Sequence, residues 1–187
     1  DCLLSRGLGD VYKRQGYYNP IYKFGKKKFI ELCLNCGVDG LIIVDLPPEE
    51  DEEFYIEAEK NKLSIIRLVT PTTDEKRLNK ILCNATGFVY YVSITGITGT
   101  QAPNIENVSK NLEKIKSVTD LPVVIGFGIR SPSQALSMAN ISDGIVVGSA
   151  VVDLIKSSLD KDDNPTKNTL NSCLDFISKV SENVKHN

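Results

Sequence analysis

Two glycine turns in the second half of the chain could bind an anion through backbone N–H groups. Gly126-Phe127-Gly128 follows the apolar run that starts at Pro122, and Gly148-Ser149-Ala150 follows a second such run, GIVVG. Both runs are rich in β-branched residues, which is typical of strands buried on both faces. Glycine lets the backbone approach an anion closely, and a helix that begins at the turn adds a positive dipole. Paired turns of this kind after the last two strands are typical of the phosphate site of a (β/α)8 barrel.

Further polar side chains fall where predicted strands end. In a parallel barrel these ends converge on one face, where active sites lie. A phosphate there would accept hydrogen bonds from the backbone N–H groups of Gly99, Gly128, Gly148 and Ser149, and from the Ser149 hydroxyl. The remaining polar strand-end positions are Tyr17, Asn19, Asp45, Thr70 and Tyr90 to Ser93.

The elements that would hold these residues repeat at a nearly constant length. Predicted strands begin near residues 41, 65, 88, 123 and 145, so the steps are 24, 23, 35 and 22 residues. A repeated strand-plus-helix unit indicates a parallel α/β fold with right-handed crossovers. An open doubly wound sheet would fit this count as well. The paired glycine turns favour an incomplete TIM (β/α)8 barrel, running from the end of strand three through helix eight.

Helix signals separate the strands. Apolar residues recur at helical spacing over Phe24–Cys36, and Thr72-x-x-Glu75 reads as a capping box that opens a helix over 73–84. Ser131, Pro132 and Gln134 combine an N-cap, a proline at the first helical position and a capping-box side chain. Residues 94–104 form a long connection between a strand and a helix. Its length suggests a lid, with an ordinary loop as the equal alternative.

Composition excludes several classes of function. A net charge of −2 favours neither nucleic acid nor an anionic membrane as a partner, and no apolar run reaches the length of a membrane span. Five scattered cysteines indicate a reducing compartment rather than a disulfide framework, which predicts a cytoplasmic protein. The single histidine, His186, stands next to the end of the sequence, so histidine catalysis is not expected. No residue pattern predicts a metal site.

The first fifteen residues do not fit the pattern that follows. Asp10–Gln15, DVYKRQ, resembles the translation of a sequencing-adapter sequence. We therefore predict that residues 1–15 are a non-native leader and that residues 16–187 form a partial barrel domain. The alternative is a natural strand over residues 11–19. With the end of a strand at residues 16–19, six strand ends are predicted in all.

Five motifs occur in an order and spacing that resemble the tryptophan synthase alpha subunit. Any one of them is weak evidence, but together they are specific, and the resemblance covers the chain from Gly16 on, about the last two thirds of the family's length. The motifs are Tyr17-Tyr18-Asn19-Pro20, Gly37-Val38-Asp39-Gly40 with Val44-Asp45-Leu46-Pro47, Tyr90-Tyr91-Val92-Ser93 running into Gly96-Ile97-Thr98-Gly99, Gly126-Phe127-Gly128-Ile129, and Gly148-Ser149-Ala150.

The resemblance implies a lyase that cleaves indole-3-glycerol phosphate to indole and glyceraldehyde 3-phosphate in tryptophan biosynthesis, without metal or cofactor. It implies an indole pocket, a phosphate site and a beta-subunit partner, which carries pyridoxal phosphate in a heterotetramer. A cytoplasmic location is implied, or the plastid stroma in a photosynthetic eukaryote. The implied roles are indole contacts for Tyr17, Leu68, Tyr90 and Phe127, phosphate contacts for Gly99, Gly128, Gly148 and Ser149, lid closure for Thr98 and partner contact for Asp45.

The sequence departs from the family pattern at its start. The family's two catalytic carboxylates, a glutamate and an aspartate, lie upstream of the Tyr17-Tyr18-Asn19-Pro20 motif, and this chain has neither. Since loss of a general acid or base costs orders of magnitude in rate, the 187 residues alone are expected to be inactive. Two other functions remain open. One is a non-catalytic module that regulates a beta subunit dependent on pyridoxal phosphate, and the other is another phosphate-binding barrel, an isomerase or epimerase.

Overall fold

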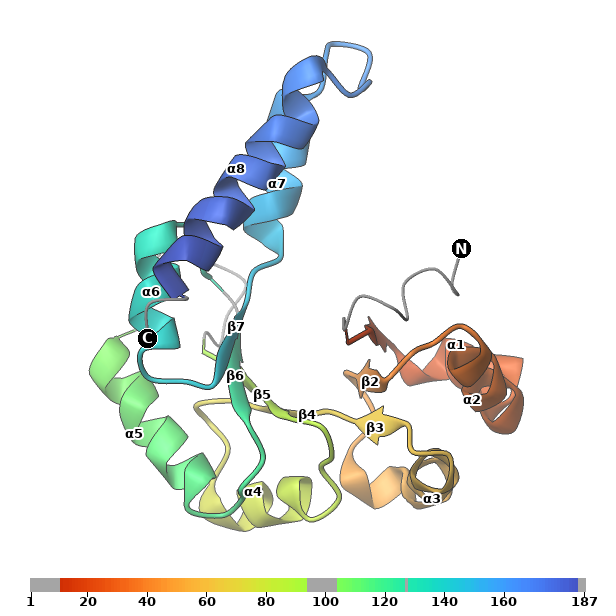
Figure 1. Cartoon of the computed structure of the whole chain (residues 1–187). Coiled ribbons are helices and arrows are strands. Elements are labelled where there is room, and N and C mark those ends of the chain that lie inside the picture. Colours follow the sequence, from red (N-terminus) through yellow and green to blue (C-terminus); the bar gives the residue numbers. More distant parts are fainter. Residues whose placement is uncertain (1–10, 94–103, 127, 185–187) are drawn as a thin grey trace. The chain divides into compact units, whose positions relative to one another are not determined.

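The computed structural model describes residues 11–93, 104–126 and 128–184 (Figure 1). These residues belong to two compact units. The first contains the chain up to Val69, with Thr73–Tyr90 and Val118–Leu121, and the second contains Thr70–Thr72, Tyr91–Ser117 and the chain from Pro122 on. Each unit contains parallel strands and helices.

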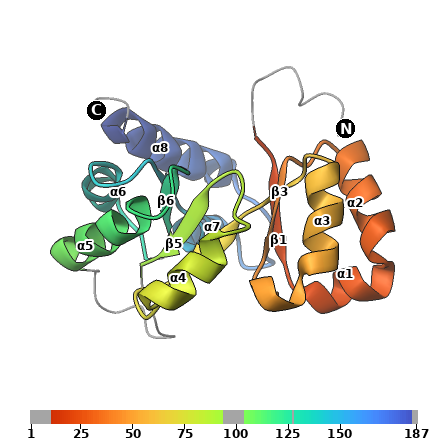
Figure 2. The ribbon, with the colours of Figure 1, turned by 90° about the horizontal axis from the view of Figure 1, so that it is seen from below.

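A parallel three-stranded sheet forms the centre of the first unit. Its order is β1 (Lys13–Gly16), β2 (Gly40–Ile43) and β3 (Ser64–Ile65), with Lys13 opposite Gly40 and Gly40 opposite Ser64. Figure 2 shows α1 (Tyr18–Phe24), α2 (Lys26–Asn35) and α3 (Glu52–Lys60) on one side of these strands. The helices bury apolar side chains against the sheet and form a core that includes Ile30, Cys33, Leu41, Phe54, Ala58 and Leu63.

The first helical segment is broken at Gly25, where the sequence predicted one helix from Phe24 to Cys36. Gly25 has φ +99° and is at once the residue that ends α1 and the residue that precedes α2. Its N–H donates to the Ile21 and Tyr22 carbonyls, and its carbonyl accepts from the Phe29 N–H. A residue with a Cβ rarely adopts this φ, so the break requires glycine. Helix α1 was not predicted, because the Asn-Pro pair inside it reads as a turn.

The strand predicted to begin near residue 65 is divided into β3 and β4 (Arg67–Val69). Ile66 lies between them, and its N–H donates to the Leu41 carbonyl at 2.9 Å. The short helix η1 (Pro48–Glu50) precedes α3, and α4 (Glu75–Leu82) packs against β4. Asp74 caps α4, since its Oδ1 accepts from the Arg77 N–H at 2.7 Å. The predicted capping box at Thr72 is therefore wrong by two residues.

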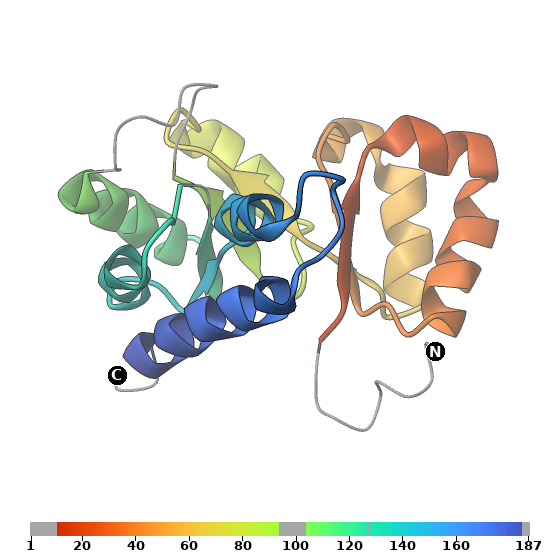
Figure 3. The ribbon, with the colours of Figure 1, turned by 90° about the horizontal axis from the view of Figure 1, so that it is seen from above.

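The second unit contains parallel strands that alternate with helices. The strand order is β5 (Val89–Val92), β6 (Val123–Gly126) and β7 (Gly144–Val146), where Tyr91 and Val92 are the part of β5 in this unit. Four helices complete the unit: α5 (Ile105–Lys116), α6 (Pro132–Ala139), α7 (Ser149–Ser158) and α8 (Lys167–Val184). Figure 3 shows α8 in dark blue running past α7 and α6, and it packs against both.

Helix α6 begins as the sequence predicted. Pro132 is its first residue, and the Ser131 hydroxyl oxygen accepts from the Gln134 N–H at 3.3 Å. The Gln134 side chain reaches back and accepts from the Arg130 N–H at 2.8 Å, one residue before the N-cap. This start fixes the chain immediately after the first glycine turn.

The parallel α/β organisation is confirmed. The non-native leader stays a prediction, but Lys13–Gln15 lie in β1 and pair with β2, so the folded region starts before the predicted boundary at residue 16. Gly16 ends β1 and Tyr18 begins α1, so the strand end predicted over residues 16–19 is too long. In the part of the chain that the structure describes, no helix is long and apolar enough to cross a membrane.

Candidate functional site

The two glycine turns leave the same edge of the sheet in the second unit. Strand β6 pairs in parallel with β7, with Gly126 opposite Val146 at their carboxyl ends. Gly128 therefore follows one strand and Gly148 follows its neighbour, which is the arrangement that the sequence predicted. Ser93 brings the end of β5 to the same place, because its N–H and its hydroxyl donate to the Gly126 carbonyl at 3.1 and 3.0 Å. Three strand ends thus meet beside the turns.

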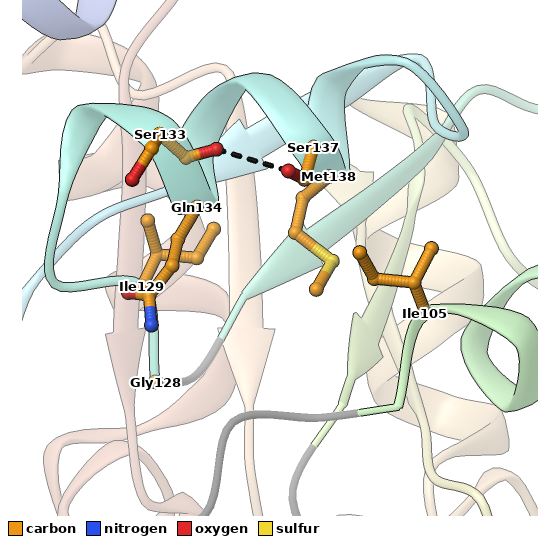
Figure 4. A pocket seen from close by; sticks show the side chains of 7 residues that line it. All are labelled: Ile105, Gly128, Ile129, Ser133, Gln134, Ser137 and Met138. Carbon is orange, nitrogen blue, oxygen red and sulfur yellow. Dashed lines mark hydrogen bonds between the residues drawn. The ribbon is translucent and has the colours of Figure 1, made fainter.

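Gly128 has a backbone conformation that favours glycine. Its φ is +86°, in the left-handed region, so a side chain at this position would strain the turn. Gly128 also lines a cavity of about 150 Å³ together with Ile129 and residues of α5 and α6. In Figure 4, Met138 of α6 and Ile105 at the start of α5 extend into the same space. Ligand pockets usually measure about 300–1,000 Å³, so this cavity alone is too small for an indole and a sugar phosphate.

Ser149 is the first residue of α7 and is exposed. The Gly148 carbonyl accepts from the N–H groups of Val151 and Val152, which closes the first turn of the helix. An added Cβ at Gly148 would meet no atom within 4 Å, so the backbone here is open to a ligand. The first turn of α7 contains no acidic side chain, and the positive end of the helix dipole is not offset by a carboxylate there. Gly148 and Ser149 can therefore present N–H and O–H donors to an anion.

The predicted indole contacts that the structure describes lie in the first unit. Tyr17 precedes α1 and is 64% exposed, Leu68 is half-buried in β4, and Tyr90 is buried in β5. Burial raises the pKa of the Tyr90 phenol, which keeps that side chain neutral. Phe127, Gly99 and Thr98, predicted for the indole pocket, the phosphate site and the lid, lie outside the described residues, as does most of the long 94–104 connection.

Asp45 has a structural contact that the sequence did not reveal. Its Oδ1 accepts from the Tyr18 N–H at 2.7 Å, so the loop after β2 caps the first turn of α1. Asp45 also lines a cavity of about 300 Å³ in the first unit, together with Pro47, Leu68 and Arg77. The carboxylate is exposed, so the capping contact leaves it accessible to a partner.

The acidic run Glu49–Glu53 contains a buried ion pair. Arg67 Nη2 of β4 donates to Asp51 Oδ2 at 2.5 Å, and the two residues are only 5% and 1% exposed. Burial raises the pKa of Asp51, and the Arg67 guanidinium opposes that shift. Two buried atoms of the pair, Asp51 Oδ1 and Arg67 Nε, have no hydrogen-bond partner among the described residues. Sequence reasoning missed this pair, and the signal available was a lone arginine inside an apolar strand.

Two further acids of this run also pair with bases. Glu49 pairs with Arg77 of α4, and Glu53 pairs with Lys26 of α2. Both carboxyl pKa values are lowered, that of Glu49 chiefly by a backbone hydrogen bond and that of Glu53 chiefly by Lys26. Among the residues that the structure describes, no group of His, Cys, Asp and Glu side chains is arranged to hold a metal ion.

Parallel strands, alternating helices and glycine turns at the carboxyl ends of the last two strands place this chain in the class of parallel α/β proteins with a TIM-barrel fold. Comparison with known proteins agrees. The family model of the tryptophan synthase alpha chain matches residues 15–181. The chain therefore belongs to the tryptophan synthase alpha chain family.

Solved structures of this fold cover nearly the whole chain. Tryptophan synthase subunit alpha from Legionella pneumophila is 28% identical with a TM-score of 0.84, and the match covers 100% of this chain and 68% of that one. A protein of Aquifex aeolicus is 33% identical with a TM-score of 0.77, over 99% and 65% of the two chains. The tryptophan synthase a2b2 complex from Pyrococcus furiosus contains a chain 26% identical with a TM-score of 0.79, over 97% and 70%.

These matches confirm the predicted fold class, an incomplete TIM barrel. The chain spans about two thirds of the length of the solved chains that it matches. The fold of the Legionella pneumophila alpha subunit matches this chain over its whole length.

Proposed function

We propose that this chain supplies the substrate-holding part of a tryptophan synthase alpha activity, the cleavage of indole-3-glycerol phosphate to indole and glyceraldehyde 3-phosphate. The observation that carries the proposal is the pair of turns at Gly128 and Gly148 on neighbouring parallel strands. Membership of the alpha chain family supports the reaction class, a carbon–carbon lyase.

The phosphate is the part of the substrate for which the described residues have the most suitable donors. Gly128, Gly148 and Ser149 offer backbone N–H groups, and Ser149 adds its hydroxyl at the start of α7. Gly99 belongs to the same proposed site. Backbone donors and a helix dipole can hold a phosphate without lysine or arginine, since the charge is spread over several short hydrogen bonds.

The indole ring requires apolar and aromatic surface. We assign this role to Tyr17, Leu68, Tyr90 and Phe127, and lid closure to Thr98. The neutral Tyr90 phenol suits an uncharged heterocycle, because a phenolate would add a charge next to it. No step of this reaction requires a cofactor, and pyridoxal phosphate belongs to the beta subunit.

Cleavage requires two proton transfers. One group protonates the indole ring carbon as the carbon–carbon bond breaks, and a base accepts the proton of the glycerol hydroxyl that becomes the aldehyde. The family's carboxylates for these steps stand before the Tyr17-Tyr18-Asn19-Pro20 motif and are not among the 187 residues. We therefore propose that the chain binds the phosphate ester and releases no indole by itself.

A beta subunit is the proposed partner. The Pyrococcus furiosus relative was solved as an a2b2 complex, and Asp45 lies on an exposed loop of the first unit that could contact such a partner. A reducing, cytoplasmic location fits the free thiols of Cys33, Cys83 and Cys173.

Calorimetric titration with glycerol 3-phosphate tests the anion site. We expect the wild-type chain to bind it, glycerol not to bind, and Ser149→Asp to weaken binding through like charge at the site. Ser158→Asp, at the other end of α7, is the matched control. Equal affinity of wild type and Ser149→Asp for glycerol 3-phosphate would contradict the assignment. A separate assay for indole from indole-3-glycerol phosphate tests inactivity, and catalytic release of indole would refute that part alone.

A further inference from the structure

Ser93 is a buried polar residue directly after β5, and none of the proposed substrate contacts uses it. The residue is only 8% exposed, and its N–H and its hydroxyl both donate to the Gly126 carbonyl, at 3.1 and 3.0 Å. A carbonyl oxygen has two lone pairs, so two donors from one residue hold it in a fixed direction. The N–H bond continues the pairing of β5 with β6, whereas the hydroxyl bond is an addition that only this side chain supplies.

The carbonyl that Ser93 holds is the last one of β6 before the first glycine turn. Gly126 ends β6, and Gly128, with φ +86°, follows two residues later. Beyond Gly128, the Gln134 side chain accepts from the Arg130 N–H at 2.8 Å. The chain around Gly128 is therefore held on both sides, by Ser93 before it and by the start of α6 after it.

An anion site made of backbone donors depends on the directions of those donors. A hydrogen bond weakens steeply when its angle departs from linearity. A backbone N–H cannot turn to follow a ligand as the flexible side chain of a lysine can. Donors that are already oriented also bind with a smaller entropic penalty. A residue that fixes the backbone on the approach to Gly128 can therefore change the affinity for an anion without touching the anion.

We propose that Ser93 is a positioning residue for the anion site, because its hydroxyl orients the Gly126 carbonyl and thereby the backbone that carries the Gly128 N–H. The inference rests on the proposed function, in which Gly128, Gly148 and Ser149 bind the phosphate. Strand β6 lies between β5 and β7, so Ser93 acts from one neighbouring strand, and Gly148 follows the other. All five residues belong to the second unit.

Ser142 provides a matched control, because its hydroxyl forms the same kind of contact at the opposite end of a strand. It donates to the Met138 carbonyl at 2.8 Å and to the carbonyl of Gly144, the first residue of β7, at 2.9 Å. In barrels the carboxyl ends of the strands carry the active site, whereas the amino ends contribute stability. Loss of either hydroxyl removes a bond to the backbone, but only Ser93 lies at the end that carries the glycine turns.

Calorimetric titration with glycerol 3-phosphate, on variants shown to be folded by circular dichroism, tests this role. We expect Ser93→Ala to raise the dissociation constant about fivefold. Ser142→Ala is expected to leave it unchanged, although urea denaturation should show a loss of stability in both variants. Equal affinity of wild type and Ser93→Ala, or equal weakening in Ser142→Ala, would overturn the positioning role alone. A wild-type chain that does not bind glycerol 3-phosphate would overturn the anion site itself, and this role with it.

A double-variant cycle tests whether Ser93 acts through the turn. Gly128→Ala is expected to weaken glycerol 3-phosphate binding, because a Cβ at φ +86° displaces the backbone there. Ser93→Ala should then weaken binding less in the Gly128→Ala chain than in wild type, since the backbone that it positions is already displaced. Fold-changes that multiply would show that the two residues act independently and would overturn the proposal.

Discussion

The Asp45 carboxylate and the Tyr18 backbone N–H, 27 positions apart in sequence, are joined by a hydrogen bond of 2.7 Å. The bond ties the loop after β2 to the first turn of α1, whose own N-cap residue, Tyr17, contributes no side-chain hydrogen bond. A position that the family resemblance assigned to a partner contact therefore also caps a helix.

Replacing Asp45 separates these two roles. Asp45→Ala removes the cap and is expected to lower the free energy of unfolding by about 1 kcal/mol. Asp45→Asn keeps an oxygen acceptor and is expected to retain most of that stability. Urea denaturation measures the difference, with the exposed Asp120→Ala as the control. Equal stability of Asp45→Ala and Asp45→Asn would show that the cap contributes nothing.

Breaking the buried pair of Asp51 and Arg67 should lower the free energy of unfolding far more than breaking an exposed pair. Arg67→Met leaves the Asp51 carboxylate buried without its partner, so the expected loss is about 3–5 kcal/mol. Arg77→Met removes the exposed partner of Glu49 and is expected to lower the free energy of unfolding much less, because solvent screens that pair. Adding Asp51→Leu to Arg67→Met should recover most of the lost stability in urea denaturation. A double variant no more stable than Arg67→Met would contradict this account.

The pKa of Asp51 predicts an unusual dependence on pH. Burial raises this pKa above that of the unfolded chain, despite the opposing effect of Arg67. The contribution of Asp51 to stability is therefore complete below the ordinary carboxyl pKa and is lost as pH rises through the raised value. We expect the stability of wild type relative to Asp51→Asn to fall as pH increases over this window. A difference that is constant with pH would be evidence against a raised pKa.

Asp143 should give a dependence of stability on pH opposite to that of Asp51. Burial acts to raise its pKa, but hydrogen bonds from the Val123 N–H at 2.8 Å and from Lys116 at 3.0 Å lower it below the ordinary value. Its contribution is complete above the ordinary carboxyl pKa and is lost as pH falls through the lowered value. The free energy of unfolding of wild type should therefore fall toward that of Asp143→Asn as the pH is lowered. An advantage that grows on acidification would disprove this assignment.

The two turn glycines should respond differently to alanine. Gly128→Ala places a Cβ on a residue at φ +86° and is expected to cost about 1–2 kcal/mol of stability. Gly148→Ala has a negative φ and open space around the added Cβ, so the fold should tolerate it. Thermal unfolding of the two variants gives the comparison. Equal melting temperatures would mean that the turn at Gly128 can relax.

The sequence predicted those features that depend on neighbouring residues. Ser131, Pro132 and Gln134 start α6 because each residue acts on a backbone group within four positions. The parallel strands followed from short β-branched runs, and the position of Gly128 and Gly148 after neighbouring strands followed from the turns that end those runs. In each case the physical cause lies within a few residues of its effect.

Features that depend on distant residues escaped prediction. The Asp45 cap on α1 and the pairing of Asp51 with Arg67 join residues 27 and 16 positions apart. The division of the predicted strand at Ile66 depends on a hydrogen bond to Leu41. A single sequence does not show which carboxylate of the acidic run Glu49–Glu53 a neighbouring strand covers.

Helix α1 has only seven residues, and it lies between a glycine that stops it and a cap that comes from beyond β2. A helix this short is unstable by itself in water, because the unfavourable free energy of nucleation exceeds the stabilisation that one or two helical turns provide. It can persist only after β1 and β2 have paired and brought Asp45 to its first turn. The Tyr17-Tyr18-Asn19-Pro20 motif is therefore expected to become ordered late in folding, after the sheet of its own unit has formed.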